Sequence, residues 1–465
     1  MTSNNLSLNI NQKSKATMML KRKIEKELSR FLHDNGRYAL LVTGARQVGK
    51  TFSIEQFGRE NYDNFVEINF IREPEALAIF NNVSNADDVY MRLSAYAKLK
   101  PRRKGQTLVF LDEIQRCPEA VTYMKFLVQR GGCHYILSGS LLGVELKDIR
   151  SVPVGFMSEV QMFPLDFEEF LWANGISEEI LENARSAFME KHPVDPFFHD
   201  QLMRYFRLYL VTGGMPDVVN SYLQTNDLTQ VAAAQQRICI EYKRDISQYD
   251  PKNALRIRDI YDRLPSELNQ QNRRFTVGTV LKGSHFDRLE DGFLWLKEAG
   301  VAIPAYNLDE PRSPLALATK RSIFKLFAND VGLLASMYMN GIQLKLLNND
   351  VDMNIGAIYE NVVAQELKAH GFSPSYFNSK KQGELDFVVE FDGHALPLEV
   401  KSGKDYKRHS ALDNVLKDSN YGIPLAYVLC NDNVAVEGKI VYLPIYMTMF
   451  IQPPSLPEKL IYKIE

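Results

Sequence analysis

Eight consecutive residues close to the N-terminus have the types and the spacing of a phosphate-binding loop. They follow the pattern G-x-x-x-x-G-K-T and are Gly44, Ala45, Arg46, Gln47, Val48, Gly49, Lys50 and Thr51. The glycines allow the backbone to curl so that N–H groups point at phosphate oxygens. Lys50 adds a positive charge for the β- and γ-phosphates, and the Thr51 hydroxyl is placed to bind Mg²⁺. The pattern therefore predicts a site for ATP and Mg²⁺.

The residues on either side of the loop have the order that such a site needs. Segment 38–43 is a short apolar run and reads as a buried strand, whereas 50–57 follows the loop without a helix breaker. A helix that starts at Lys50 directs its N-terminal dipole at the anion. An ordinary glycine-rich turn is the alternative, and the strand, loop and helix order argues against it.

Two acids follow a second apolar run. Residues 108–111 are apolar and are followed by Asp112 and Glu113. A buried parallel strand would deliver both acids to the edge of the sheet where ligands bind. On the strand next to the loop, Asp112 is expected to hold Mg²⁺, and Glu113 is expected to polarise the attacking water as a general base. In the alternative interpretation, Asp112 caps the next helix and Glu113 lies in its first turn.

Further apolar runs indicate the sheet that positions these groups. Segments 64–70 and 134–137 read as strands, and the second ends in Ser138-Gly139-Ser140. Ser138 and Ser140 are candidates to sense the γ-phosphate, and a plain turn is the alternative. From 38 to 143 strands and helices alternate, which predicts an α/β fold with a doubly wound parallel sheet.

These motifs resemble the prokaryotic AAA-type ATPases that carry a C-terminal restriction-endonuclease-like domain of unknown function. The shared marks are GARQVGKT, FLDEIQ, LSGSLLG, PLDFEEFL and Gly213-Gly214-Met215-Pro216, and the resemblance extends from about Met19 into the C-terminal region. It implies ATP binding, Mg²⁺ dependence and a helical lid after the sheet. Many relatives place an arginine after the glycine that precedes PLDFEEF, but here Gly155 is followed by Phe156. The resemblance therefore leaves open which arginine completes the catalytic charge.

A second group of polar residues lies on two alternating segments near the C-terminus. Segments 384–391 and 394–401 are separated by Asp392-Gly393, a strong hairpin signal that sets the register. This register places Asp386 opposite Glu399, about 5 Å apart at Cβ. Two facing carboxylates repel each other, and Mg²⁺ or Mn²⁺ between them would remove the conflict. Lys401 projects from the same face and could orient the attacking water or bind the scissile phosphate.

A third acid lies on a predicted helix. The run 355–370, followed by Gly371 as a C-cap, reads as an amphipathic helix. Glu360 shares a stripe of this helix with Val363 and Leu367. A carboxylate on an apolar stripe requires a partner.

The pattern formed by Glu360, Asp386, Glu399 and Lys401 resembles the PD-(D/E)xK nuclease superfamily. The resemblance implies that Asp386 and Glu399 hold the metal ion and that Lys401 assists the nucleophilic water. Glu360 matches the helix acid of the Holliday-junction-resolvase-like branch. In the alternative interpretation the hairpin only exposes a polar face, on which Lys401 neutralises Glu399.

The length of 465 residues allows about three domains. The middle of the chain, from about 174 to 349, is rich in predicted helices, which predicts a helical lid after the core. Within it, residues 254–337 read as helices followed by a two-stranded hairpin, and this order predicts a winged-helix-like domain. The predicted division is as follows: a disordered N-terminus at 1–18, the P-loop core at 19–173, the helical lid at 174–250, the winged-helix-like domain at 251–349 and the endonuclease-like domain at 350–465.

Composition limits the partners. The net charge of −2 implies no global attraction to nucleic acid, so any DNA contact must be local. Two basic clusters qualify: residues 98–104, which also read as a solvated loop, and Lys401, Lys404, Lys407 and Arg408 beside the hairpin acids. The four scattered cysteines fit no zinc spacing and suggest reduced thiols in a cytoplasmic protein. No apolar run of the sequence is long enough to span a membrane. The sequence is compatible with a homo-oligomer but does not specify one.

Three hypotheses follow for the function. In the first, ATP binding and hydrolysis by the core gate a C-terminal domain that engages or cuts DNA, with a second Mg²⁺ or Mn²⁺ at the hairpin. In the second, the chain is an ATP-driven regulatory switch whose C-terminal domain is inactive and binds a partner. A third and weaker hypothesis is a small-molecule kinase, which Glu113 disfavours because it suits the activation of water.

Overall fold

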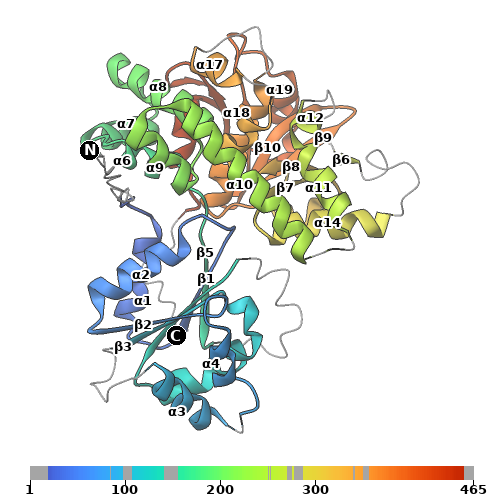
Figure 1. The fold of residues 1–465 in the computed structure, drawn as a ribbon. Helices are drawn as coiled ribbons and strands as arrows, with labels where there is room; N and C mark the ends of the chain where they lie inside the picture. Colours follow the sequence, from blue (N-terminus) through green and yellow to red (C-terminus); the bar gives the residue numbers. More distant parts are fainter. Residues whose placement is uncertain are drawn as a thin grey trace, which may run out of the picture.

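The computed structural model describes most of the chain. The described residues are 19–83, 85–97, 107–140, 155–249, 251, 253–269, 275–276, 286–338, 341–348 and 355–454. The expected N-terminal tail, the basic cluster at 98–104 and part of the LSGSLLG motif lie outside them. Two lobes are visible in Figure 1, one around a five-stranded sheet and the other around a nine-stranded sheet.

The first lobe contains the predicted parallel sheet. Its strands are β1 (Ala39–Thr43), β2 (Asn64–Asn69), β3 (Thr107–Asp112), β4 (His134–Ser138) and β5 (Met157–Gln161). All neighbours are parallel, in the order β2-β3-β4-β1-β5. The expectation that the acid-bearing strand lies next to the loop strand is wrong, because β4 pairs with both β1 and β3 and separates them. The edge strand β5 was not predicted.

Helices cover both faces of this sheet, so the doubly wound prediction is confirmed. One face packs against α1 (Ile24–His33) and α2 (Lys50–Asn61), and the other against α3 (Ala86–Tyr96) and α4 (Pro118–Arg130). Successive strand residues point to opposite faces, so each buried strand needs apolar side chains throughout. The short 3₁₀ helices η1 (Pro74–Ile79) and η2 (Ile114–Arg116) follow β2 and β3.

A helical region follows the sheet. It consists of α6 (Phe167–Ala173), α7 (Glu178–Glu190), α8 (Pro196–Thr212), α9 (Pro216–Thr225) and α10 (Leu228–Tyr249). Asp166 and Glu169 form the capping box of α6. Gly213 and Gly214 separate α8 from α9, and a Cβ on Gly214 would lie 1.9 Å from the carbonyl oxygen of Leu165. Only glycine therefore allows α9 to begin this close to the chain that enters α6.

The second lobe is built on a sheet that joins the middle of the chain to its C-terminal part. Its strands are β6 (Phe275–Thr276), β7 (Ala302–Leu308), β8 (Thr319–Ala328), β9 (Ser375–Ser379), β10 (Gly383–Phe391), β11 (His394–Val400), β12 (Ala426–Cys430), β13 (Ala435–Glu437) and β14 (Ile440–Pro444). The order is β13-β14-β12-β11-β10-β9-β7-β8-β6. The expected hairpin of β7 and β8 is present. Through β7 and β9 the sheet continues across the boundary predicted at 349/350, and the winged-helix and domain assignments stay predictions.

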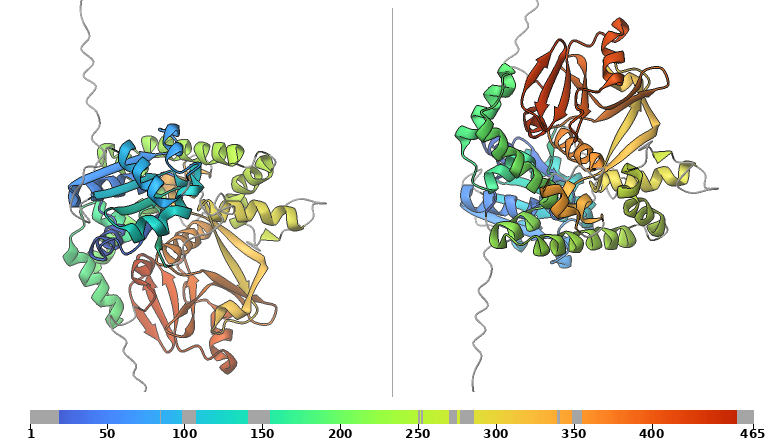
Figure 2. Two further views of the ribbon diagram at one scale, coloured as in Figure 1. Left: turned by 90° about the horizontal axis from the view of Figure 1, so that it is seen from below. Right: turned by 90° about the horizontal axis from the view of Figure 1, so that it is seen from above.

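The remaining helices surround this second sheet, and Figure 2 shows both lobes from below and from above. They are α11 (Ala254–Asp262), α12 (Leu264–Leu268), α14 (Phe286–Glu298), α15 (Leu315–Ala318), α16 (Val331–Ser336), α17 (Ile342–Leu347), α18 (Gly356–Ala369), α19 (Ser410–Lys417), η4 (Ser419–Tyr421) and η5 (Ile445–Phe450). The predicted helix 355–370 corresponds to α18, but it is not amphipathic. Every residue from Ala357 to Leu367 is buried, because α8, α16, β7, β8, β11 and η5 pack around the helix.

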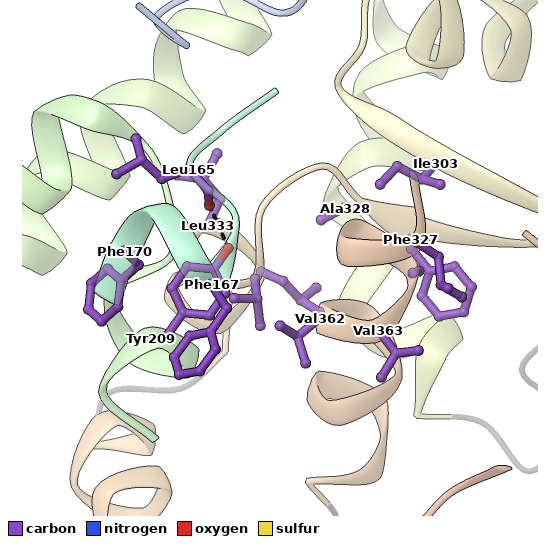
Figure 3. Close-up of a cluster of buried hydrophobic side chains, with 14 of the residues drawn as sticks. Leu165, Phe167, Phe170, Tyr209, Ile303, Phe327, Ala328, Leu333, Val362 and Val363 are labelled. Carbon is purple, nitrogen blue, oxygen red and sulfur yellow. Dashed lines mark hydrogen bonds between the residues drawn. The ribbon is translucent and has the colours of Figure 1, made fainter. Parts of the chain in front are cut away.

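A shared apolar cluster connects the lobes. Phe167 and Phe170 of α6 and Tyr209 of α8 lie beside side chains of α16 and α18, and the Tyr209 hydroxyl donates to the carbonyl oxygen of Leu165 at 2.6 Å (Figure 3). The Phe167 N–H donates to the Glu366 carboxylate of α18 at 2.9 Å. The two lobes therefore share one core. Within the described ranges, no helix is long and apolar enough to cross a membrane.

Candidate functional site

The predicted phosphate-binding loop leads from β1 into α2. Gly44, Gln47 and Gly49 have φ values of 136°, 65° and 95°, and this left-handed backbone curls the chain into a nest. The Lys50 ammonium turns back on the loop and donates to the carbonyl oxygens of Gly44 and Ala45 at 2.8 and 2.7 Å. Burial lowers the pKa of Lys50 to about 8, against the raising effect of the carboxylates of Glu113 and Asp112.

The structure brings the two predicted Mg²⁺ ligands together. Although β4 separates β3 from β1, the strand that leads into the loop, the Thr51 hydroxyl at the start of α2 lies 3.1 Å from Asp112 Oδ2. Asn69, at the end of β2, donates to the same oxygen at 2.9 Å, and the Ser138 hydroxyl donates to Asp112 Oδ1. A hydroxyl and a carboxylate are hard oxygen ligands of the kind that Mg²⁺ prefers, so these residues fit the ion.

Glu113 follows Asp112 in an unusual backbone conformation. Its φ and ψ are 56° and 46°, a left-handed geometry that costs a non-glycine residue about 1 kcal/mol or more. Its carboxylate accepts from Gln115 Nε2 at 2.5 Å. Such strain is common where a side chain must be aimed at a ligand. Ser140 also lies here, and its hydroxyl accepts from Arg46 Nε at 3.4 Å.

A cavity of about 440 Å³ connects these groups. It is lined by the loop, by the ends of β3 and β4, by Leu20 and Arg22, and by the first turns of α9. Its volume is within the range of small-molecule sites. A larger cavity of about 1190 Å³ lies between the lobes, but of the predicted site residues only Gly44 and Ala45 line it. The smaller cavity is therefore the candidate site.

Arg22, which no sequence motif indicated, ties the loop to the chain before α6. Its guanidinium donates to the carbonyl oxygens of Val48 and Phe163 at 2.8 and 2.7 Å and lies 3.1 Å from the Glu169 carboxylate. Asn69 was missed in the same way. Both residues contact groups that are distant in the sequence, so the local spacing of residues did not indicate them.

Helix α10 also contacts the loop, which the sequence did not reveal. Arg46 forms an ion pair with Asp245 at 2.7 Å, and Gln47 donates to Glu241. The Tyr242 hydroxyl donates to the Arg46 carbonyl oxygen at 3.3 Å. Burial raises the pKa of Asp245 to about 6, against the lowering effect of the Arg46 guanidinium. The loop is thus held by the helix that leads into the second lobe.

At the C-terminal hairpin, the predicted register is confirmed. Phe387 pairs with Leu398 and Phe391 with His394, and Asp392 and Gly393 have φ values of 48° and 73°, as a two-residue hairpin turn requires. One step beyond this ladder, Asp386 Oδ2 accepts from the N–H of Val400 at 2.9 Å.

Glu399 is the unusual member of this group. The residue is 7% exposed, and its Oε2 has no hydrogen-bond partner among the described residues. Lys401 donates to the other oxygen at 2.8 Å. Burial and the nearby Asp386 carboxylate raise the pKa of Glu399 to about 7, although Lys401 acts against them. The side chain therefore lacks half of the partners that a buried carboxylate requires.

The third predicted acid has a different partner. Glu360 is buried and lies 3.7 Å from the Lys325 ammonium, which forms a closer ion pair with Glu384 at 2.7 Å. Lys325 comes from β8 and is fully buried. Among the described residues, no three or more His, Cys, Asp or Glu side chains are grouped as a metal site. The structure therefore does not assemble Glu360, Asp386 and Glu399 into the expected three-carboxylate group.

Ion pairs between lysines and carboxylates neutralise part of this acidic region and part of the basic cluster beside it. Lys325 was not identified from the sequence as a partner of these acids, although a lysine inside the apolar run 322–327 indicates a buried charge that needs a counter-ion. In the basic cluster, Lys401 contacts Glu399 and Lys407 contacts Glu437 at 2.5 Å. These contacts reduce the positive charge available to DNA.

Comparisons with known proteins support the interpretation of the first lobe as a P-loop domain. Family models match an AAA domain at 36–171, a domain of unknown function (DUF8612) at 203–346 and a domain of unknown function (DUF4143) at 355–447. A comparison with curated proteins found no match.

Three solved structures are similar at low identity. A Walker-type ATPase of Pyrococcus abyssi is 15% identical, covering 69% of this chain and 96% of its own, with a TM-score of 0.42. The ORC1 protein of Aeropyrum pernix, solved with DNA, is 13% identical, covering 72% and 94%, with a TM-score of 0.29. Cdc6p of Pyrobaculum aerophilum is 11% identical, covering 73% and 97%, with a TM-score of 0.27. These scores carry no conclusion, but the family match and the loop geometry agree: residues 36–171 are an AAA-type P-loop ATPase domain, followed by two domains of unknown function.

Proposed function

We propose that this chain binds ATP with Mg²⁺ in the cavity at the end of β1 and β3 and hydrolyses it. The observation that carries the proposal is the 3.1 Å contact between Thr51 and Asp112 at a loop that holds Lys50. The loop N–H groups and Lys50 bind the phosphates. When bound, Mg²⁺ would neutralise charge on the β- and γ-phosphate oxygens.

The acid that directly follows β3 is the proposed general base for hydrolysis. Glu113 lines the same cavity as Lys50 and is held by Gln115, so it can accept a proton from a water directed at the γ-phosphate. Ser140 and Arg46 line the same cavity and can contact the γ-phosphate oxygens. Water, and not a second substrate, is the proposed acceptor.

Glu113→Gln tests this role. The variant should keep its affinity for ATP, because the loop and Lys50 are untouched, while steady-state phosphate release falls about 100-fold or more. Glu119→Gln, in the first turn of α4 and outside the cavity, is the control. If wild type releases no phosphate from ATP with Mg²⁺, with or without DNA, hydrolysis is not the function.

The C-terminal hairpin supports a second candidate activity, metal-dependent DNA cleavage. The buried and unpartnered oxygen of Glu399 beside Asp386 favours it, since a divalent cation would supply the missing partner. Lys401 would then be free to contact the scissile phosphate. In the competing proposal, the hairpin is inactive, Lys325 and Lys401 neutralise its acids permanently, and the chain is an ATP-driven switch that binds a partner.

Two hydrogen bonds connect the loop to the residue that follows β8, the strand whose lysine pairs with an acid of the second lobe, and we propose that this connection couples the two sites. Tyr242 donates to the Arg46 carbonyl oxygen and accepts from Asn329 Nδ2, both at 3.3 Å. Asn329 directly follows β8, and Lys325 on that strand pairs with Glu384. A change in the loop on nucleotide binding would therefore shift β8 and its lysine.

Tyr242→Phe tests the coupling, because it removes one hydroxyl and keeps the ring. ATP affinity should stay within a few-fold of wild type, whereas the ATP-dependent change in hydrogen exchange of β8 and β10 should be lost. Tyr261→Phe is the matched control, since the Tyr261 hydroxyl donates to Cys239 and not to the loop. An unchanged exchange response in Tyr242→Phe would show that the signal takes another route.

A further inference from the structure

One wall of the nucleotide cavity carries an amide without a partner. Asn220, on α9, lines the cavity and is only 6% exposed. Its Oδ1 has no hydrogen-bond partner among the described residues. A buried polar atom without a partner is unfavourable, so such atoms commonly mark a position that a ligand completes. This amide points to a ligand with a matching polar edge.

The rest of that wall suits a flat, largely apolar group. Lys50, Thr51 and the loop N–H groups are assigned to the phosphates, which leaves Leu20, Phe52 and Pro216 as the apolar lining. Phe52 is 47% exposed although its ring is large and apolar. An aromatic ring and an aliphatic side chain are the usual contacts for the face of a base, and a side-chain amide is the usual contact for its edge.

We propose that Asn220 reads the base of the nucleotide, by accepting from the 6-amino group of adenine and donating to N7. An asparagine amide offers one acceptor and two donors, and adenine presents the complementary pair on this edge. Guanine and hypoxanthine carry an oxygen at position 6, so both of their groups on this edge are acceptors. One of the two contacts must then fail, and Oδ1 stays buried without a partner.

The assignment also connects base recognition to the lid. Asn220 lies one turn into α9, and the N–H of Gly214, just before this helix, donates to Asp330 Oδ2 at 2.6 Å. Asp330 caps α16 of the second lobe through the N–H of Leu333 at 2.8 Å. A correct base would hold α9 against the nucleotide through Asn220, whereas a phosphate tail alone would not.

The inference rests on the proposed function, and ITP is the probe that separates the two. ITP keeps the triphosphate, the ribose and the purine ring and replaces the 6-amino group with oxygen. Wild type should bind ATP about tenfold or more tightly than ITP in competition titrations with mant-ATP. Asn220→Leu should weaken ATP binding to the level of ITP and leave ITP nearly unchanged, so that the ratio falls to about one.

The ratio is measured within each variant, so a partly unfolded preparation does not change it. Ser221→Ala, on the same helix but not part of the cavity lining, should keep the wild-type ratio. A wild type that binds ATP and ITP equally, or an Asn220→Leu variant that keeps the preference for ATP, would overturn the assignment. If wild type binds neither ATP nor ITP, the proposed ATP site itself is wrong, and the assignment of Asn220 fails with it.

Discussion

Lys50→Ala is expected to weaken ATP binding about 100-fold or more, to the limit of detection in a mant-ATP titration. In the proposed site the ammonium is the cation that the loop places at the β- and γ-phosphates, and without it less positive charge faces them in a buried site. Removing one member of a buried charge pair costs about 2–5 kcal/mol, and 100-fold corresponds to about 2.8 kcal/mol.

The fold should survive this substitution. Among the described residues, Lys50 donates to two loop carbonyl oxygens, and a buried charge contributes little to stability unless it is well paired. The thermal unfolding midpoint should therefore stay close to wild type. Lys26→Ala, at an exposed position of α1, is the matched control. Unchanged ATP affinity in Lys50→Ala would refute the assignment of the loop.

Asp386→Ala should abolish Mn²⁺-dependent DNA nicking while ATP turnover stays within a few-fold of wild type. The Asp386 carboxylate accepts from the N–H of Val400 and lies near enough to Glu399 to raise its pKa, and it is far along the chain from the loop, so only the second activity should depend on it. The assay uses branched, single-stranded and double-stranded DNA, with and without ATP. Loss of one of two carboxylate ligands commonly removes metal-dependent chemistry altogether.

The control for this variant lies on the same strand. Glu390→Ala removes an exposed acid from the same face of β10, where it pairs with Ala395, and nicking should be retained. If wild type nicks none of these DNA substrates, the cleavage proposal is wrong. The interpretation as a regulatory switch is then preferred, with Lys325 and Lys401 as permanent counter-ions of the acids.

Several features could be predicted because neighbouring residues decide them. The loop from Gly44 to Thr51 is contiguous, so its glycines, lysine and threonine specify the nest without help from the rest of the chain. The hairpin is similar: Asp392 and Gly393 accept the positive φ of a two-residue turn, and the turn sets which residues face each other.

Strand order could not be read in this way. Buried parallel strands are apolar throughout, so nothing in the strands themselves states which neighbours pair. The insertion of β4 between β1 and β3, and the continuation of the nine-stranded sheet through β7 and β9, depend on long-range hydrogen bonds. The helix α18 illustrates the same limit, since its apolar stripe was visible but its burial on all sides comes from elements distant in the sequence, such as α8, β7, β8 and η5, that pack around it.

The amino-acid sequence by itself determined which groups are candidates to bear the chemistry: the phosphate loop, the two acids at and just after the end of β3, and the two carboxylates of the hairpin. Only the tertiary structure decided which distant residues surround them. Asn220 in the nucleotide cavity, Tyr242 against the loop and Lys325 among the C-terminal acids are each separated from their partners by many residues. A short motif encodes backbone conformation through local sterics, whereas contacts across the chain arise when packing excludes water from whole surfaces at once.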